Sequence, residues 1–144
     1  MADLGDLPRL AARLSRDLSA RRIAHVVSGA AAMAAHGFVR ATKYIDILVV
    51  VPSLRLPEVF DVVRSHGFEG DDRELIASLR NRYVAELRSG RMSVEILIPV
   101  LPYHATLVER ATQLEVGGVV VPFVSREDLV VLKMLWHRAK SLSR

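Results

Sequence analysis

The sequence predicts a single α/β domain, of the α+β kind, in which helices cover one side of a mixed, mostly antiparallel sheet. The chain has 144 residues, a length typical of one domain, and 51% of them are hydrophobic, which is enough for a buried core. Short apolar runs typical of strands alternate with segments in which apolar residues recur at helical spacing. No internal repeat or low-complexity segment interrupts the chain. We therefore expect residues 1–144 to form one domain.

The first third of the chain is expected to hold a helix, a strand, a short helix and a second strand. Leucines recur at helical spacing in the first segment, and Pro8 suits its first turn. The short helix is rich in alanine, and His36-Gly37 supplies an end with a glycine cap. The second strand is a run of branched apolar residues stopped by Pro52. These elements are expected over residues 8–20, 23–27, 30–35 and 44–51.

The remaining two thirds are expected to add helices and two hairpins. Small glycine-containing links, at Ser89-Gly90-Arg91 and at Gly117-Gly118, join pairs of strand-like runs and are typical of β-hairpins. Ser125, with an acid three residues later, is typical of a helix start. The helices are expected over 57–65, 70–81 and 102–112 and after Ser125, and the strands over 83–87, 92–98, 113–116 and 119–124.

Two acidic residues stand alone in apolar strands. Asp46 lies in the run over 44–51, and Glu95 lies in the run over 92–98. An ionised carboxylate in such a place costs free energy unless a cation or a hydrogen-bond donor meets it. Because side chains alternate along a strand, Tyr44 shares the face of Asp46. A metal ion is the simplest partner for Asp46, whereas a lone Glu95 also suits a solvent-facing strand.

The turn before the short helix suits a phosphate group. Ser28-Gly29 ends the first strand, and a residue without a side chain lets the backbone approach a ligand closely. The N–H groups that open the next helix point outward at its positive end. We therefore expect a polyphosphate to bind near Ser28 and Gly29.

These features together resemble the nucleotidyltransferase superfamily of the polymerase-β palm type, and within it the small bacterial AbiEii-type toxins and minimal nucleotidyltransferases. The family's pattern is a small-residue turn, a helix, Arg-x-Thr-x-Asp-x-Asp and a third carboxylate from a later strand. The resemblance spans about residues 23–137. The matching residues are Ser28-Gly29, Ala32, His36-Gly37, Arg40, Thr42, Ile45-Asp46-Ile47, Glu95 and Lys133.

The resemblance implies a palm-like fold and a set of roles. Asp46 and Glu95 would be the catalytic carboxylates and would bind Mg²⁺ or Mn²⁺. A nucleoside triphosphate would be bound by Ser28, Gly29, Arg40, Thr42 and Lys133. The implied reaction transfers a nucleoside monophosphate to RNA or protein. An antitoxin-like protein partner is also implied.

The chain departs from the family's pattern at Tyr44, where the first Asp of Asp-x-Asp is expected. Three explanations fit: an inactivating substitution, a natural loss of the chemistry with retention of the fold, or altered chemistry that uses one metal ion. Tyrosine in a strand also has a simple packing rationale. Two hypotheses follow, a nucleotidyltransferase weakened by Tyr44, or an inactive nucleotide- or RNA-binding module or partner subunit.

Composition favours an anionic partner and argues against several other classes. The formal net charge is +4 and the sequence pI is about 10.0. There is no cysteine for disulfides, thiol chemistry or a Cys-ligated zinc site. No Gly-x-Ser-x-Gly elbow, paired-histidine metal spacing or dinucleotide-binding glycine motif is present. The acidic N-terminus lacks an apolar signal segment and no run is long enough to span a membrane, so we expect a cytoplasmic protein.

The last helix is expected to present one basic stripe to solvent or to a ligand. Its members recur at helical spacing and are Lys133, His137, Lys140 and Arg144. Only Lys133 has a counterpart in the family's pattern, so the role of the other three is left open.

Overall fold

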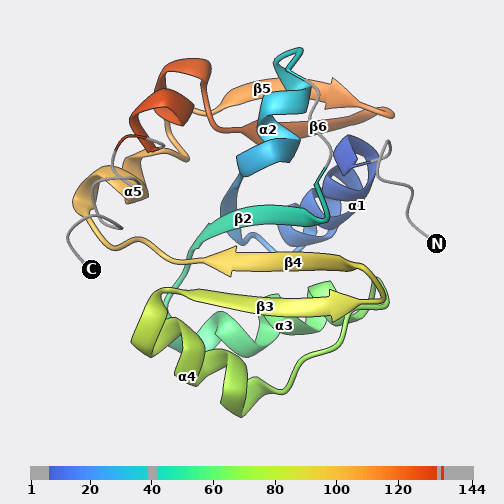
Figure 1. Ribbon diagram of the computed structural model, residues 1–144, viewed down its shortest axis with the longest axis vertical. Helices are drawn as coiled ribbons and strands as arrows, with labels where there is room; N and C mark the ends of the chain where they lie inside the picture. The colour runs from blue at the N-terminus through green and yellow to red at the C-terminus, as the bar shows by residue number, and fades with distance from the viewer. Residues whose placement is uncertain (1–6, 39–41, 133, 135–144) are drawn as a thin grey trace.

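The computed structural model describes residues 7–38, 42–132 and 134. Within them, six strands form one sheet against which the helices pack (Figure 1). The helices are α1 (Leu7–Ala20), α2 (Gly29–Ala35), α3 (Leu56–Arg64), α4 (Asp72–Arg82) and α5 (Pro102–Thr106), with a short 3-10 helix at Ser53–Arg55 and further helix over 126–132. The strands are β1 (Ala24–Ser28), β2 (Tyr44–Val50), β3 (Val84–Ser89), β4 (Met92–Leu97), β5 (Thr112–Val116) and β6 (Val119–Phe123). The predicted fold class is confirmed.

The sheet is mixed, with the strand order β3-β4-β2-β1-β6-β5. Strand β2 pairs parallel with β4 and β1 pairs parallel with β6, whereas the other three pairings are antiparallel. Parallel neighbours need a crossover connection, and α3 and α4 supply it between β2 and the β3–β4 hairpin. Both predicted hairpins are present, and each has glycine at positive φ in its loop. The backbone thus brings β2 and β4, which carry the two isolated acids, side by side.

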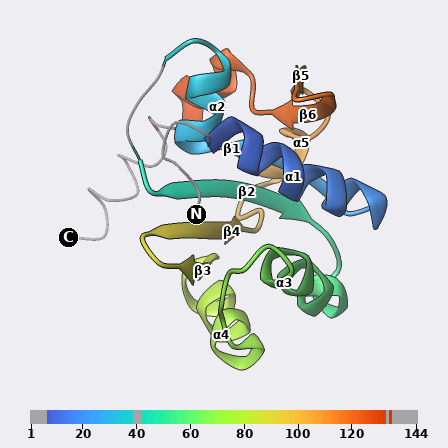
Figure 2. The ribbon, with the colours of Figure 1, turned by 90° about the vertical axis from the view of Figure 1, so that its right-hand side faces the viewer.

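One face of the sheet holds the main core. Because side chains alternate along a strand, Ile45, Ile47 and Val49 of β2 all point toward this face. They are fully buried there, together with side chains from α1 to α4. Helices α1 and α3 lie next to one another on it (Figure 2). Burial of this apolar surface is the principal force that holds the helices on the sheet.

The opposite face is divided into an apolar end and a polar end. Val26 and Leu48 form a small buried cluster with Leu107 and Val124, which follow α5 and β6. Helices therefore do not cover one side only, as the sequence had predicted, because this cluster brings the α5 segment onto the second face (Figure 1). Toward the start of β2 the same face carries polar side chains, so a site can form there.

Local signals in the sequence explain most element ends. Asp71 caps α4, because its carboxylate accepts a hydrogen bond from the Glu74 N–H at 3.2 Å. Ser125 caps the last helix in the same way, through the Asp128 N–H at 3.1 Å. The predicted helix over 102–112 is shorter than expected and ends at Thr106. No described helix is both long and apolar enough to cross a membrane.

The segment after α5 does not continue the helix, because side chains of α5 and of this segment are hydrogen-bonded to the last helix. The Asp128 carboxylate accepts a hydrogen bond from the Tyr103 hydroxyl and two from the Arg110 guanidinium. Turns between these anchors lead to β5 at Thr112.

Buried His25 makes the stability of the fold depend on pH. Its Nδ1–H donates to the Ile23 carbonyl at 2.8 Å, so Nε2 accepts from the Ser15 hydroxyl at 2.7 Å. The neutral ring is thereby satisfied, and burial lowers the pKa of His25 below 6.5. Below about pH 6.5 the unfolded chain binds a proton that the folded chain refuses, so the contribution of His25 to stability is lost as pH falls.

We expect His25→Gln to remove this pH dependence. Between pH 6.5 and 5.5 the free energy of unfolding of the wild type should fall relative to the variant by up to about 1 kcal/mol. Urea denaturation at the two pH values measures the difference. Ser15→Ala is the control, because it should cost about 1 kcal/mol at both pH values and keep the slope. Parallel curves for wild type and His25→Gln would contradict the assignment.

Candidate functional site

The two isolated acids meet at the polar end of the second face. Asp46 of β2 and Glu95 of β4 are direct partners in the parallel register. In-register neighbours point to the same side of a sheet, so the two carboxyl groups lie together. On the other side of Asp46, Ser28 of β1 is its antiparallel partner. The structure therefore places three of the predicted site residues in one row across three strands.

The surroundings of the pair make its negative charge unfavourable. Both residues are half-buried, and the Asp46 Oδ1 atom is enclosed without a hydrogen-bond partner among the described residues. Burial raises the pKa of Asp46 above its usual value. Burial, followed by the hydrogen bond and the charge of Asp46, raises the pKa of Glu95 to about 8. Ionising both carboxyl groups in this position costs free energy, and a shared proton or a bound cation would relieve that cost.

Gly29 lets the Asp46 carboxylate fit beneath the start of α2. Its φ is +60°, and a Cβ atom placed on it would lie 1.9 Å from Asp46 Oδ2. Glycine is thus required at position 29 for two reasons, the positive φ and the lack of space for a Cβ atom beside Asp46. The sequence had predicted that this glycine admits a ligand phosphate, whereas in the structure the group nearest its missing side chain is the Asp46 carboxylate.

Tyr44 lies on the same face as Asp46, two residues earlier on β2, as period two predicted. It is half-buried, and its partner on β4 is Ser93. The Lys43 ammonium group lies 5.4 Å from the centre of its ring. The aromatic ring therefore occupies the β2 position two residues before Asp46, on the face that carries the carboxylate pair.

The structure describes some of the predicted nucleotide-binding residues and not others. The Ser28 side chain stands at the N-cap of α2 but makes no capping hydrogen bond among the described residues. The Thr42 hydroxyl accepts a hydrogen bond from the Tyr44 N–H at 3.2 Å, so it orders the start of β2. Arg40 and Lys133 lie outside the described residues, as does the rest of the predicted basic stripe. His36 ends α2 as predicted, and its Nε2 donates to the Val124 carbonyl at 3.0 Å.

Sequence reasoning missed a third acid, Glu86 of β3, which pairs with Glu95 in the antiparallel register. Its carboxylate accepts hydrogen bonds from the Ser93 hydroxyl at 2.7 Å and from Arg88 Nε at 3.0 Å. The Ser93 hydrogen bond and the Arg88 guanidinium hold the pKa of Glu86 below its usual value. A signal was available, because a two-residue hairpin loop after Ser89 fixes the register and places residue 86 opposite residue 95.

The donors present fit one hard divalent cation better than two. Mg²⁺ takes oxygen ligands, retains water and uses few protein carboxylates. Asp46 and Glu95 supply such oxygens, and the unpartnered Oδ1 is an available ligand atom. In the part of the chain that the structure describes, no three acidic or histidine side chains gather into a metal-binding group. Glu86 belongs to the row but is neutralised by Arg88 instead.

Comparison with solved structures identifies the fold. A protein of Thermotoga maritima assigned as a nucleotidyltransferase aligns with a TM-score of 0.68 and 17% identity, over 94% of this chain and 87% of that one. The antibiotic-resistance factor ANT(2'')-Ia aligns with a TM-score of 0.60 and 17% identity, over 89% and 70% of the two chains. A nucleotidyltransferase-like protein of Paracoccidioides brasiliensis gives 0.54 and 19%, over 84% and 61%.

The fold is therefore that of nucleotidyltransferases. No protein-family model matches the sequence, and no curated protein matches it significantly. At identities below 20% these alignments establish a shared fold, and the activity of this chain has to be argued from its own residues.

We expect Gly29→Ala to destabilise the protein through Asp46. The new methyl group would displace the Asp46 carboxylate as well as strain the backbone at positive φ. Gly117→Ala is the matched control, because Gly117 has φ +57° and open space around its Cα. The control should lose about 1–2 kcal/mol of unfolding free energy, and Gly29→Ala clearly more. Equal losses in urea denaturation would show that Asp46 does not press on this glycine.

The carboxyl pair should make the metal-free protein less stable as pH rises. Because the folded-state pKa of Glu95 is raised from 4.5 to about 8, the folded chain holds a proton that the unfolded chain has lost, and stability falls across that interval. In EDTA, the Tm of the wild type should be lower at pH 8.5 than at pH 6.5. Glu95→Gln should show a smaller drop. A drop of the same size in both proteins would contradict the coupling of Glu95 to Asp46.

Proposed function

We propose that this protein is a nucleotidyltransferase, weakened by Tyr44, that binds a nucleoside triphosphate with Mg²⁺ and transfers a nucleoside monophosphate to RNA or protein. One observation carries the proposal: Asp46 and Glu95 are register partners on β2 and β4, with an enclosed and unpartnered carboxylate oxygen, in a nucleotidyltransferase fold. A crystal structure of ANT(2'')-Ia contains adenylyl-2''-tobramycin, a nucleotidylated product, which supports this type of reaction for the fold.

Asp46 and Glu95 would hold the divalent cation, Mg²⁺ or Mn²⁺. When bound, such an ion neutralises charge on the triphosphate and polarises its oxygens. Ser28 and Gly29 would meet the triphosphate from the β1 side of Asp46, because Ser28 is the register partner of Asp46 and its hydroxyl makes no cap hydrogen bond. Arg40 and Lys133 would add positive charge. Thr42 would act on the site through the start of β2, whose first N–H it binds.

A second candidate function follows from Tyr44. Its neutral ring stands on the Asp46 face where a third ligand would be needed, and the described residues contain no three-ligand group. A protein with this site could bind nucleotide or RNA without catalysis, or act as a partner subunit. An antitoxin-like partner remains a proposal drawn from the family resemblance, and a cytoplasmic location remains a proposal drawn from the composition of the sequence.

The deciding experiment is covalent labelling. Wild type, Tyr44→Asp and Asp46→Asn are incubated with each α-labelled nucleoside triphosphate, Mn²⁺ and bacterial RNA or protein. Tyr44→Asp should raise incorporation at least about tenfold, because it adds a carboxylate on the Asp46 face, and Asp46→Asn should abolish it. Thermal melts with and without Mn²⁺ show whether each variant is folded and binds metal.

The outcomes separate the two functions. Incorporation by the wild type, lost in Asp46→Asn, supports the enzyme. Nucleotide binding without incorporation by the wild type or by Tyr44→Asp supports the inactive module. If Tyr44→Asp melts lower than the wild type and Mn²⁺ does not restore it, Tyr44 packs the sheet and is not a replaced metal ligand.

A further inference from the structure

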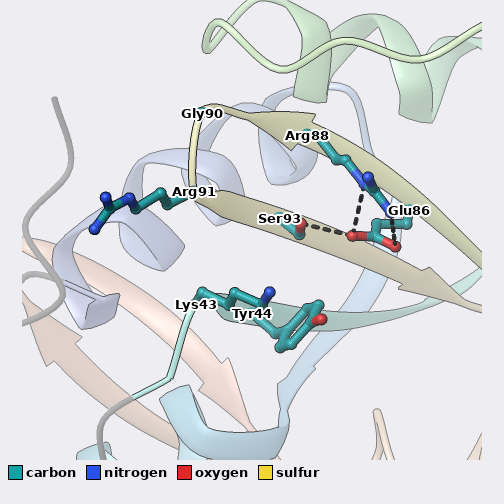
Figure 3. Close-up of a pocket in the computed structure, with 7 residues that line it drawn as sticks. All are labelled: Lys43, Tyr44, Glu86, Arg88, Gly90, Arg91 and Ser93. Atoms are coloured by element: carbon teal, nitrogen blue, oxygen red, sulfur yellow. Dashed lines mark hydrogen bonds and ion pairs between the residues drawn. The ribbon is translucent and has the colours of Figure 1, made fainter.

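A second polar region adjoins the carboxylate pair, at the start of β2 and the β3–β4 hairpin. It is a cavity of about 360 Å³. Figure 3 shows the side chains around it, which come from three neighbouring strands and the hairpin loop. The lining residues are Lys43, Tyr44, Glu86, Arg88, Gly90, Arg91 and Ser93. Three of these are cationic and one is anionic, so the cavity is basic.

The charges within the cavity are not all compensated. Arg88 is paired with Glu86, which also accepts the Ser93 hydrogen bond. The Lys43 ammonium lies over the Tyr44 ring and helps to lower the pKa of Glu86, yet no carboxylate of the described residues forms an ion pair with it. The same holds for Arg91, whose exposed side chain extends outward past the start of β4 (Figure 3). Two positive charges are therefore available to a ligand.

The cavity lies a short, fixed distance from the candidate catalytic residues. Tyr44 precedes Asp46 by two positions, and Ser93 precedes Glu95 by two. Two residues along a strand correspond to about 7 Å. Ser28 and Gly29 adjoin Asp46 from the neighbouring strand, on the β1 side. The carboxylate pair thus adjoins both the turn that would bind the donor nucleotide and a basic cavity that has no role in the proposal above.

We propose that this cavity is a binding subsite for phosphate groups of the acceptor, with Lys43 and Arg91 as the phosphate-binding residues. The inference rests on the proposed function and refines its acceptor. Because the two available cations point in different directions from separate elements, they suit a ligand that carries phosphates along its length. A phosphate held there would bring the adjoining sugar hydroxyl toward Asp46 and Glu95. A neutral protein hydroxyl would gain nothing from these charges.

The test measures binding in EDTA and without nucleotide, so that it does not depend on catalysis. The probe is a fluorescein-labelled 12-nucleotide single-stranded oligouridylate, followed by anisotropy at about 50 and 200 mM salt. Lys43→Ala/Arg91→Ala is compared with Arg9→Ala/Arg13→Ala. The control removes the same charge from exposed arginines of α1, which adjoin the β5–β6 loop instead. Thermal melts confirm that both variants are folded.

The cavity variant should bind the oligonucleotide at least about tenfold more weakly, and its salt dependence should fall by about 1.4 in log–log slope, since two cations no longer meet the single strand. The control should stay within about twofold. If uridine 5′-monophosphate displaces the probe at a concentration similar to that of unlabelled oligouridylate, the subsite binds a single nucleotide phosphate. If uridine 5′-monophosphate does not displace the probe, the subsite requires a polynucleotide.

Three results of the binding assay would overturn the subsite: no binding by the wild type at low salt, equal losses of affinity in the two variants, or an acidic peptide of matched charge that displaces the probe as well as unlabelled oligouridylate does. The proposed function can fail separately. RNA binding that depends on Lys43 and Arg91, without nucleotide incorporation, keeps the subsite and rejects the enzyme. Incorporation that is unchanged in Lys43→Ala/Arg91→Ala keeps the enzyme and rejects the subsite.

Discussion

The arrangement of this protein depends on one pairing, the parallel register that sets Asp46 beside Glu95. Burial raises the pKa of both carboxyl groups, and the neighbouring Asp46 raises the pKa of Glu95 further, so it is costly for both groups to carry a charge. Hydrophobic residues in their place would give a more stable sheet, because most of the other residues in the same strands are apolar and buried. The apolar core on the opposite face must therefore outweigh the cost of the pair, which is the pattern expected of a functional site.

The same pair links the sheet to helix α2. Asp46 Oδ2 occupies the space that a side chain at position 29 would need, and Gly29 at positive φ is the residue at which β1 becomes α2. Because the two groups are in close contact, a shift of the carboxylate would displace the turn that begins the helix, and a shift of the turn would displace the carboxylate. Ligand binding on either side of Asp46 would be communicated through direct contact, without a longer pathway.

Much of this could be predicted from the sequence, because the signals are local. Helical spacing of leucines, hairpin glycines and the Ser125 cap are short-range effects of backbone geometry, and the corresponding elements are present. Isolation in an apolar strand was enough to single out Asp46 and Glu95. The register across strands was harder, since β2 and β4 are far apart in sequence. The cavity around Lys43 depends on that register, and the Gly29–Asp46 contact depends on the register between β1 and β2, so alternation within one strand does not reveal either. Glu86 could have been placed, because the β3–β4 hairpin loop fixes its register with Glu95.

Tyr44 is the residue at which the two halves of the site meet. It follows Lys43, pairs with Ser93 and lines the basic cavity, and it lies two residues before Asp46 on the same face. An aspartate there would bring negative charge beside Lys43 and reduce the net positive charge of the cavity. A neutral aromatic keeps the cavity basic and forms one of its walls. The residue at position 44 therefore sets the charge of this end of the sheet, beside both Lys43 and Asp46.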